Sequence, residues 1–173
     1  MTDRKPDALA PSSGPGALRK APTGDLVSRG LADLKALEQI VVFPDKHLEA
    51  VVRRELKKPE GPLTRQDLES LEELEAEGRE IEDLTGLEHC VNLTWLRLDD
   101  NQISDLTPLA SLANVTHLWL GFNQISDITP LASLTNLTEL DFEENPLSQE
   151  SLEVHVPTLE SRGVGVILDD DDD

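Results

Sequence analysis

The stretch that decides the fold runs from Leu93 to Asp127 and reads LTWLRLDDNQISDLTPLASLANVTHLWLGFNQISD. Its pattern Leu-x-Leu-x-x-Asn-x-Ile-x-Asp-Leu-x-Pro-Leu recurs 22 residues later, with one leucine replaced by isoleucine. The matched residues are Leu96, Leu98, Asn101, Ile103, Asp105, Leu106, Pro108 and Leu109, then Leu118, Leu120, Asn123, Ile125, Asp127, Ile128, Pro130 and Leu131. A weaker copy follows at Leu140, Phe142, Asn145 and Leu147, and a fragment precedes at Leu74, Ala76 and Ile81. A fixed period of this length indicates repeats that bury their apolar faces by stacking on one another.

Each copy predicts a strand, a turn and a short helix. The Leu-x-Leu pair predicts a strand whose two leucines point into the core, because alternate residues of a strand share a face. The asparagine is expected to end the strand and bond to turn backbone, so that Asn101, Asn123 and Asn145 form a ladder. Thr107-Pro108 and Thr129-Pro130 predict the N-cap and first residue of a short helix on the convex side.

Composition limits the classes of function. The 173 residues carry 15 Lys and Arg against 35 Asp and Glu, a formal net charge of −20. Such a field repels nucleic acid and anionic membranes and attracts basic partners, although solubility alone would also explain it. Cys90 is the single cysteine, so no intrachain disulfide can form, which suits a reducing compartment. No apolar run spans a bilayer or resembles a secretory signal, so we expect a cytoplasmic protein or export without a cleaved signal peptide.

The chain divides into four expected segments. Residues 1–24 are rich in Pro, Gly, Ser and Ala and predict a disordered arm. Residues 25–80 predict a helical N-terminal segment, residues 81–168 the repeats with a closing strand, and residues 169–173 an acidic tail. The first helix is predicted from apolar residues at three- and four-residue steps, namely Val27, Leu31, Leu34, Leu37, Ile40 and Val41.

Two further helices are predicted in the N-terminal segment. The triplet Phe43-Pro44-Asp45 opens the second, with Leu48, Val51, Val52 and Leu56 on its apolar face. A capping motif at Thr64–Asp67 opens the third, with Leu68, Leu71 and Leu74 inward. These helices are placed to cover the first repeat, whose leucine core would otherwise be open.

The 22-residue frame resembles the leucine-rich repeats of the internalin type, and residues 43–87 are similar to the helical cap that precedes such repeats. The resemblance extends over residues 43–168 and implies an α/β fold: a right-handed solenoid with an α-helical N-terminal cap, short convex helices and a concave, partner-binding sheet. The sequence departs from internalins in having few repeats and no signal peptide, wall-anchoring tail or Ig-like domain. Host-cell invasion is therefore not carried over, and intracellular scaffolds with similar repeats fit better.

No catalytic or metal-binding pattern is found in the sequence. The four histidines, His47, His89, His117 and His155, have no ligand spacing, and the sequence offers Cys90 no base. Cys90 also aligns with core leucines at positions 112 and 134, so we interpret it as a buried apolar residue. Gly-rich phosphate loops and nucleophile elbows are missing from the sequence. We therefore expect a protein that is not an enzyme and that needs neither cofactor nor metal.

The candidate site is the set of side chains that alternate with the strand leucines. Stacking the copies predicts three columns on the concave face: Glu73, Trp95, His117 and Glu139; Glu75, Arg97, Trp119 and Asp141; Glu77, Asp99, Gly121 and Glu143. We expect the partner to contact Trp95, Arg97, Asp99, His117, Trp119, Glu139, Asp141 and Glu143. A solvent-facing tryptophan is typical of a binding anchor. The competing interpretation is surface packing, with Trp119 on Arg97 and Trp95 on His117.

Two functions fit these observations. The first is a monomeric protein-interaction module that binds a peptide, a helix or a basic patch, without binding nucleic acid or membrane. The second is an acidic inhibitor, or antitoxin-like protein, that masks a basic nucleic-acid-binding or toxin surface by charge mimicry. Salt distinguishes them, because charge mimicry weakens sharply with ionic strength while an aromatic anchor does not.

Overall fold

A computed structural model describes residues 39–169 of the chain. The predicted arm at residues 1–24, the helix expected from residue 25 and the end of the acidic tail, residues 170–173, lie outside the described residues. None of the helices in the described part is long and apolar enough to cross a bilayer.

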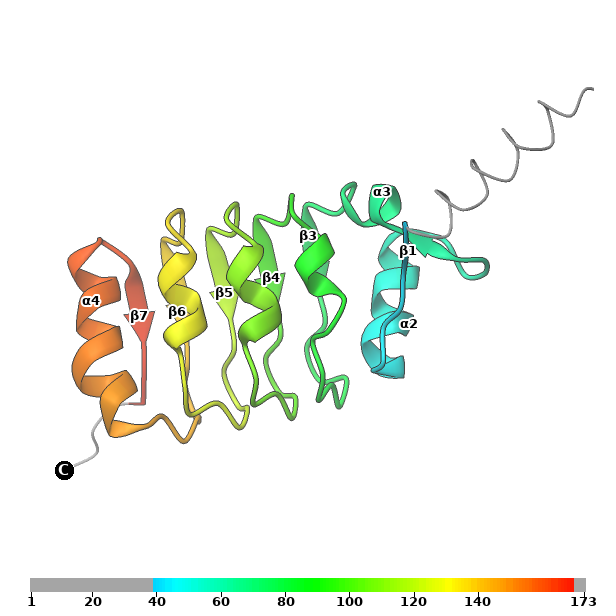
Figure 1. Cartoon of the computed structure of the whole chain (residues 1–173). Coiled ribbons are helices and arrows are strands. Elements are labelled where there is room, and N and C mark those ends of the chain that lie inside the picture. The colour runs from blue at the N-terminus through cyan, green and yellow to red at the C-terminus, as the bar shows by residue number, and fades with distance from the viewer. Residues whose placement is uncertain (1–38, 170–173) are drawn as a thin grey trace, which may run out of the picture. The chain divides into compact units, whose positions relative to one another are not determined.

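The repeats build one parallel sheet of five strands in sequence order. The strands are β3 (Glu73–Glu75), β4 (Trp95–Arg97), β5 (His117–Trp119), β6 (Glu139–Asp141) and β7 (Gly165–Ile167). Leu74, Leu96, Leu118, Leu140 and Val166 face one another across the sheet. Figure 1 shows the strands side by side with the short helical turns over one face. The predicted strands, their register and the closing strand are confirmed.

The return path of the first three coils is a tight helical turn rather than an α-helix. Three 3₁₀ turns, η1 (Leu87–His89), η2 (Thr107–Ser111) and η3 (Thr129–Ser133), connect the strands. The prediction that Thr107 and Thr129 are N-caps was wrong, because each is the first residue of its turn. The side chain that satisfies the exposed amide is the preceding aspartate: Oδ1 of Asp105 accepts from the Thr107 amide at 2.8 Å, and Asp127 does the same for Thr129.

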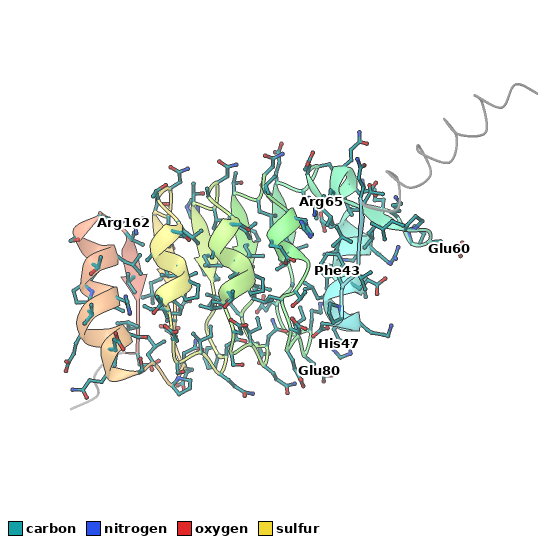
Figure 2. The ribbon with its side chains drawn as sticks, in the orientation of Figure 1. Phe43, His47, Glu60, Arg65, Glu80 and Arg162 are labelled. Atoms are coloured by element: carbon teal, nitrogen blue, oxygen red, sulfur yellow. The ribbon has the colours of Figure 1, made fainter. Side chains whose placement is uncertain are left out.

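The last coil departs from the repeat and closes the stack. A π-helical turn, η4 (Ser151–His155), continues into α4 (Val156–Ser161), which buries Val156 and Leu159 as predicted. Arg162, at this end of the molecule (Figure 2), donates to the carbonyls of Ala132 at 3.1 Å and Leu134 at 2.5 Å. These two bonds attach the coil that lacks the repeat pattern to the coil before it.

The described residues that precede the sheet, 39–72, lie at its β3 end (Figure 1). The helix α2 (Lys46–Glu55) is N-capped by Asp45 and buries Leu48, Val51 and Val52, as predicted. The Phe43 ring packs on Gly86, where a Cβ would meet the ring at 2.6 Å. Because Gly86 also has a φ of +106°, glycine is required there for both space and backbone conformation.

Two predictions for this segment were wrong. Ile40 and Val41 form strand β1 (Ile40–Val41), not a helix end, and pair antiparallel with β2 (Leu63–Thr64). Both residues are β-branched, so their apolar spacing fits a strand equally well. The helix α3 (Arg65–Leu68) is a single turn with the expected Thr64 capping box, and Leu74 lies on β3 instead. The sheet begins at Glu73, where the predicted columns begin, so the first strand lies ahead of the segment boundary placed at residue 81.

The core is one continuous cluster of Leu, Ile and Val side chains that extends from α2 to α4. The strand leucines at positions 74, 96, 118 and 140 are at most 1% exposed. Cys90 is fully buried within this cluster, as its place in the repeat predicted. Burial, reinforced by the nearby Glu88 carboxylate, raises the pKa of the Cys90 thiol to about 12, so this sulfur stays protonated and unreactive.

Candidate functional site

The second face of the sheet carries the side chains that alternate with the buried leucines. We call the six residues on β4, β5 and β6 the tryptophan face: Trp95, Arg97, His117, Trp119, Glu139 and Asp141. All six are partly exposed, whereas the leucine between each pair is buried. The register pairs Trp95 with His117 and Arg97 with Trp119, which places them in the first two predicted columns.

The aromatic rings contact one another diagonally across the strands. The ring centroids of Trp95 and Trp119 lie 4.9 Å apart at an interplanar angle of 51°. Trp119 also stacks on His117, with centroids 5.6 Å apart and planes 15° apart. The ring contacts therefore differ from those of the competing surface-packing interpretation, which paired Trp119 with Arg97 and Trp95 with His117. Long side chains reach the diagonal neighbour of an adjacent strand, and here this contact replaces the directly opposite one.

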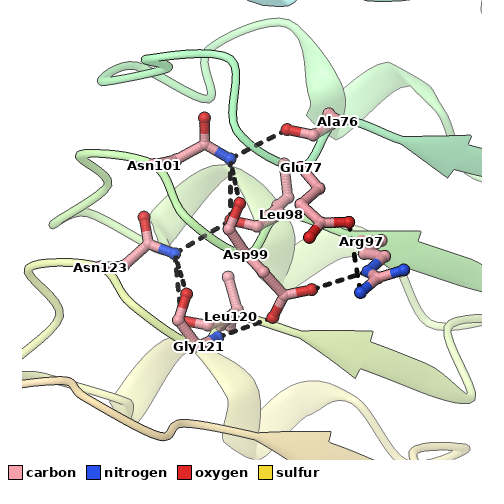
Figure 3. A network of polar contacts seen from close by, with 9 residues as sticks. All are labelled: Ala76, Glu77, Arg97, Leu98, Asp99, Asn101, Leu120, Gly121 and Asn123. Atoms are coloured by element: carbon pink, nitrogen blue, oxygen red, sulfur yellow. Dashed lines mark hydrogen bonds and ion pairs between the residues drawn. The ribbon is translucent and has the colours of Figure 1, made fainter.

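Arg97 is held by carboxylates instead of by a ring. Its Nε donates to Oδ2 of Asp99 at 3.0 Å, and its NH2 group lies 3.2 Å from Oε2 of Glu77. The other oxygen of Asp99 accepts from the Gly121 amide at 3.0 Å (Figure 3). The hydrogen bond with Asp99, together with the nearby Glu77 charge, raises the pKa of Arg97.

Asp99 differs from the other predicted contact residues because it is buried. Only 8% of its surface is exposed, and both of its oxygens already have partners within the protein. It links β4 to the turn after β5 and orients Arg97, so it supports the exposed residues of the face. The sequence pattern places Asp99 correctly in the third column but does not reveal that its carboxylate turns inward.

A cavity of about 510 Å³ opens beside Trp119, at the end of the tryptophan face. Its lining comprises Glu77, Arg97, Asp99, Asp100, Trp119, Phe122, Asp141 and Glu143. Five of the eight predicted site residues line this cavity, while Trp95, His117 and Glu139 lie outside it. The cavity thus combines an aromatic wall with several carboxylates.

The sequence pattern predicted neither Asp100 nor Phe122 as a lining residue, and the apolar one is Phe122. It is 55% exposed and has a φ of 55°, a left-handed conformation that large side chains rarely adopt. Positions 78, 100 and 144, one or two periods away, have the same backbone conformation with Gly, Asp and Glu. The sequence does contain a signal for this residue, namely a large apolar side chain at a repeat position that otherwise holds Gly, Asp or Glu.

Asp141 is a partly buried carboxylate whose charge is only partly compensated. Partial burial raises its pKa, and the nearby charges of Asp99, Asp169 and Glu139 add to this, although the Glu143 amide donates to it at 2.9 Å. Within residues 39–169, no Lys or Arg forms an ion pair with Asp141 or Glu143. A docked cation would therefore meet negative charge that the described part of the protein leaves uncompensated.

Positive charge is concentrated in the N-terminal segment. Beyond residue 80 the only Lys or Arg residues of the chain are Arg97 and Arg162, and Arg97 is already paired with Glu77 and Asp99. The described residues contain no group of three His, Cys, Asp or Glu side chains that could hold a metal ion. The sheet face is therefore acidic around its aromatic centre.

Comparisons with known proteins agree with this architecture. The family model for leucine-rich repeats in two copies matches residues 91–133 and 113–154. Internalin InlF of Listeria monocytogenes is 38% identical over 64% of this chain and 33% of that chain, with a TM-score of 0.61. The functional domain of InlJ from the same species, which includes a cysteine ladder, is 26% identical over 72% of this chain and 26% of that one, with a TM-score of 0.62.

A leucine-rich-repeat protein of Leptospira interrogans is also similar, with 26% identity over 60% of this chain and 27% of that chain and a TM-score of 0.52. This chain thus spans between 26% and 33% of the length of the three structures. No curated protein matches it.

Proposed function

Since the repeats of this chain are leucine-rich repeats of the internalin type, we propose that it is a protein-interaction module that binds a partner through the tryptophan face. Leucine-rich-repeat domains are in general protein–protein interaction modules, and their internalin-like relatives are typically not enzymes. The observation that carries the proposal is the contact between Trp95 and Trp119 on the solvent side of the sheet.

The tryptophan pair supports binding because of what it exposes. Two indole rings form an apolar surface with polar N–H edges, and such rigid aromatic groups are the commonest energetic anchors of protein interfaces. Both rings are partly exposed among the described residues. A partner that covers them gains apolar burial at little cost in side-chain entropy.

The size and charge of the face limit the partner. Five strands spaced ~4.8 Å apart give a sheet ~19 Å long, which is too small for the ~800 Å² that each side of a standard interface buries. A short helix, an extended peptide or a small patch of a larger protein fits this strip. Glu73, Glu75, Glu139, Asp141 and Glu143 surround the aromatic rings, so we propose a basic contact surface on the partner.

The test is capture of the partner from the native host by the wild-type chain, by two tryptophan variants and by one control variant. Trp95→Ala and Trp119→Ala should each lose the captured protein, while Val42→Ala should retain it. Val42 is 73% exposed and belongs to the N-terminal segment, so it is a matched loss of exposed apolar surface. Equal capture by all four proteins would exclude the tryptophan face as the binding site.

Salt then separates the aromatic anchor from simple charge attraction. Affinity that persists from low to physiological ionic strength, where the Debye length is ~8 Å, supports the anchored interface. Affinity that falls steeply over this range, and that is insensitive to both tryptophan substitutions, supports masking of a basic surface by charge alone.

A further inference from the structure

Gly121 lacks a side chain at a position where the other repeats carry a carboxylate, although its backbone conformation does not require glycine. The equivalent positions in the repeat are Glu77, Asp99 and Glu143. Gly121 is not in the left-handed region, so any residue could adopt its backbone conformation. A Cβ at this position would lie 3.3 Å from Oδ1 of Asp99 and 3.6 Å from Oδ1 of Asp141. Glycine therefore keeps space open between two carboxylates that line the cavity.

Phe122, the next residue, departs in the opposite direction. It is a large side chain at a position whose φ of 55° favours glycine, asparagine or aspartate. Its ring is mostly exposed and lines the same cavity as Trp119. Two adjacent residues thus differ from the repeat pattern. Gly121 lacks a side chain, Phe122 adds a ring, and both differences affect the same cavity.

The charges around this cavity select the ligand. Arg97 is the one cation among its lining residues, and Glu77 and Asp99 already bind it. Asp100, Asp141 and Glu143 remain as carboxylates without an ion-pair partner in the described part of the chain. Burial and the neighbouring negative charges raise the pKa of Asp141. A cation beside Asp141 would stabilise the ionised carboxylate against both effects, so this shift also favours a cationic ligand.

We propose that this cavity receives one arginine side chain of the protein partner, with its guanidinium plane against Trp119 and Phe122 and its N–H groups on Asp141 and Glu143. The inference rests on the proposed function, which supplies the partner. Arginine fits because its planar group stacks on aromatic rings and offers a fork of donors to carboxylates. Lysine offers neither the plane nor the fork, so it should bind more weakly.

The experiment uses a minimal probe on the full chain. Nα-acetyl-arginine amide is titrated into ¹⁵N-labelled protein while the Gly121 amide and the Trp119 indole N–H are followed by NMR. Saturable shifts at both groups are expected with arginine, smaller shifts with Nα-acetyl-lysine amide, and none with the neutral isostere Nα-acetyl-citrulline amide. Equal shifts with citrulline, or no saturable shift with arginine, would overturn the proposal.

Variants tie these shifts to the cavity. Phe122→Asn and Asp141→Asn should each weaken arginine binding by about tenfold, which corresponds to ~1.4 kcal/mol. Glu144→Asn is the matched control, because Glu144 has a φ of 52° but does not line the cavity, and it should bind as the wild type does. Unchanged binding by Phe122→Asn and Asp141→Asn would overturn the proposal. Calcium chloride alone that reproduced the shifts and blocked arginine would also overturn it, in favour of a metal site.

The outcomes distinguish this inference from the proposed function. A partner that is lost by Trp95→Ala but retained by Phe122→Asn leaves the tryptophan face standing and removes the arginine cavity. If arginine shifts the resonances of the cavity while Trp95→Ala still captures the partner, arginine binding in the cavity is supported. The wider tryptophan face is then excluded as the binding site.

Discussion

The indole rings of Trp95 and Trp119 lie 4.9 Å apart, although the two residues are not directly opposite each other on β4 and β5. The residue opposite Trp95 is His117, which stacks on Trp119 instead. The three rings therefore form one aromatic layer on the exposed face of β4 and β5.

This layer should show energetic coupling between the tryptophans. A double-mutant cycle with Trp95→Ala and Trp119→Ala should give a coupling of about 0.5–1.5 kcal/mol in urea melts, as contacting aromatic pairs do. Leu152→Ala is the control partner for Trp95, because Leu152 is 44% exposed and lies on the last coil. Additive effects in both cycles would mean that the ring contact contributes nothing to stability.

Asn123 should contribute far more than its size suggests. It is 7% exposed, its Oδ1 accepts from the Ile103 amide at 3.0 Å, and its Nδ2 donates to the carbonyls of Leu98 and Leu120 at 2.9 and 3.0 Å. We expect Asn123→Ala to lower the free energy of unfolding by about 1–3 kcal/mol, because buried backbone groups lose their partner. The exposed Asn136 makes one bond, to Ala113, so Asn136→Ala should be near neutral. Similar losses in both variants would argue against the buried ladder.

The backbone conformation of Phe122 should lower the free energy of unfolding of the protein. Its φ of 55° is expensive for a residue of this size but acceptable for asparagine. Phe122→Asn should therefore raise the free energy of unfolding by about 1 kcal/mol, or the melting temperature by ~2–4 °C. The neighbouring Gln124 has no such conformation, so Gln124→Asn should give no gain. A lower melting temperature for Phe122→Asn would show that the contacts of the ring outweigh the backbone strain.

Asp67 should make the N-terminal segment sensitive to acid. Burial raises its pKa, but the bonds with Lys58 and Thr64 outweigh that effect and lower the pKa to about 2. Because the folded pKa lies below the unfolded value of ~3.9, the stabilisation is complete above pH ~4 and is lost as pH falls towards 2. Asp67→Asn should be less stable than the wild type at neutral pH, and the difference should shrink between pH 4 and 2. A constant difference over this range would contradict the assigned pKa.

The sequence was sufficient for most features that depend on the 22-residue period, although not for the caps of the turns at Thr107 and Thr129. The strands, their register, the buried leucines, the asparagine ladder and the core position of Cys90 follow from stacking one copy on the next. These features repeat, so a single physical requirement, burial of the apolar face, places all of them at once.

The features that could not be predicted depend on individual side-chain directions or on competition between local structures. Asp99 occupies its expected column, yet its carboxylate turns inward because the Gly121 amide and Arg97 both attract it. The ring contacts depend on rotamers that the pattern does not encode. Ile40 and Val41 satisfy a helical spacing, but pairing with Leu63 and Thr64 gives them backbone partners in a strand.

The asparagine ladder also makes the number of repeats adjustable. Asn101, Asn123 and Asn145 each donate to the carbonyl 25 residues earlier, which belongs to Ala76, Leu98 and Leu120 respectively. If the 22 residues from Asp99 to Leu120 were removed, Asn123 would meet the carbonyl of Ala76 in the place of Asn101. Duplication or loss of one unit would therefore leave the bonding of the asparagine ladder unchanged. Such an event would lengthen or shorten the exposed face by one row, so that new combinations of surface side chains could arise on an unaltered scaffold.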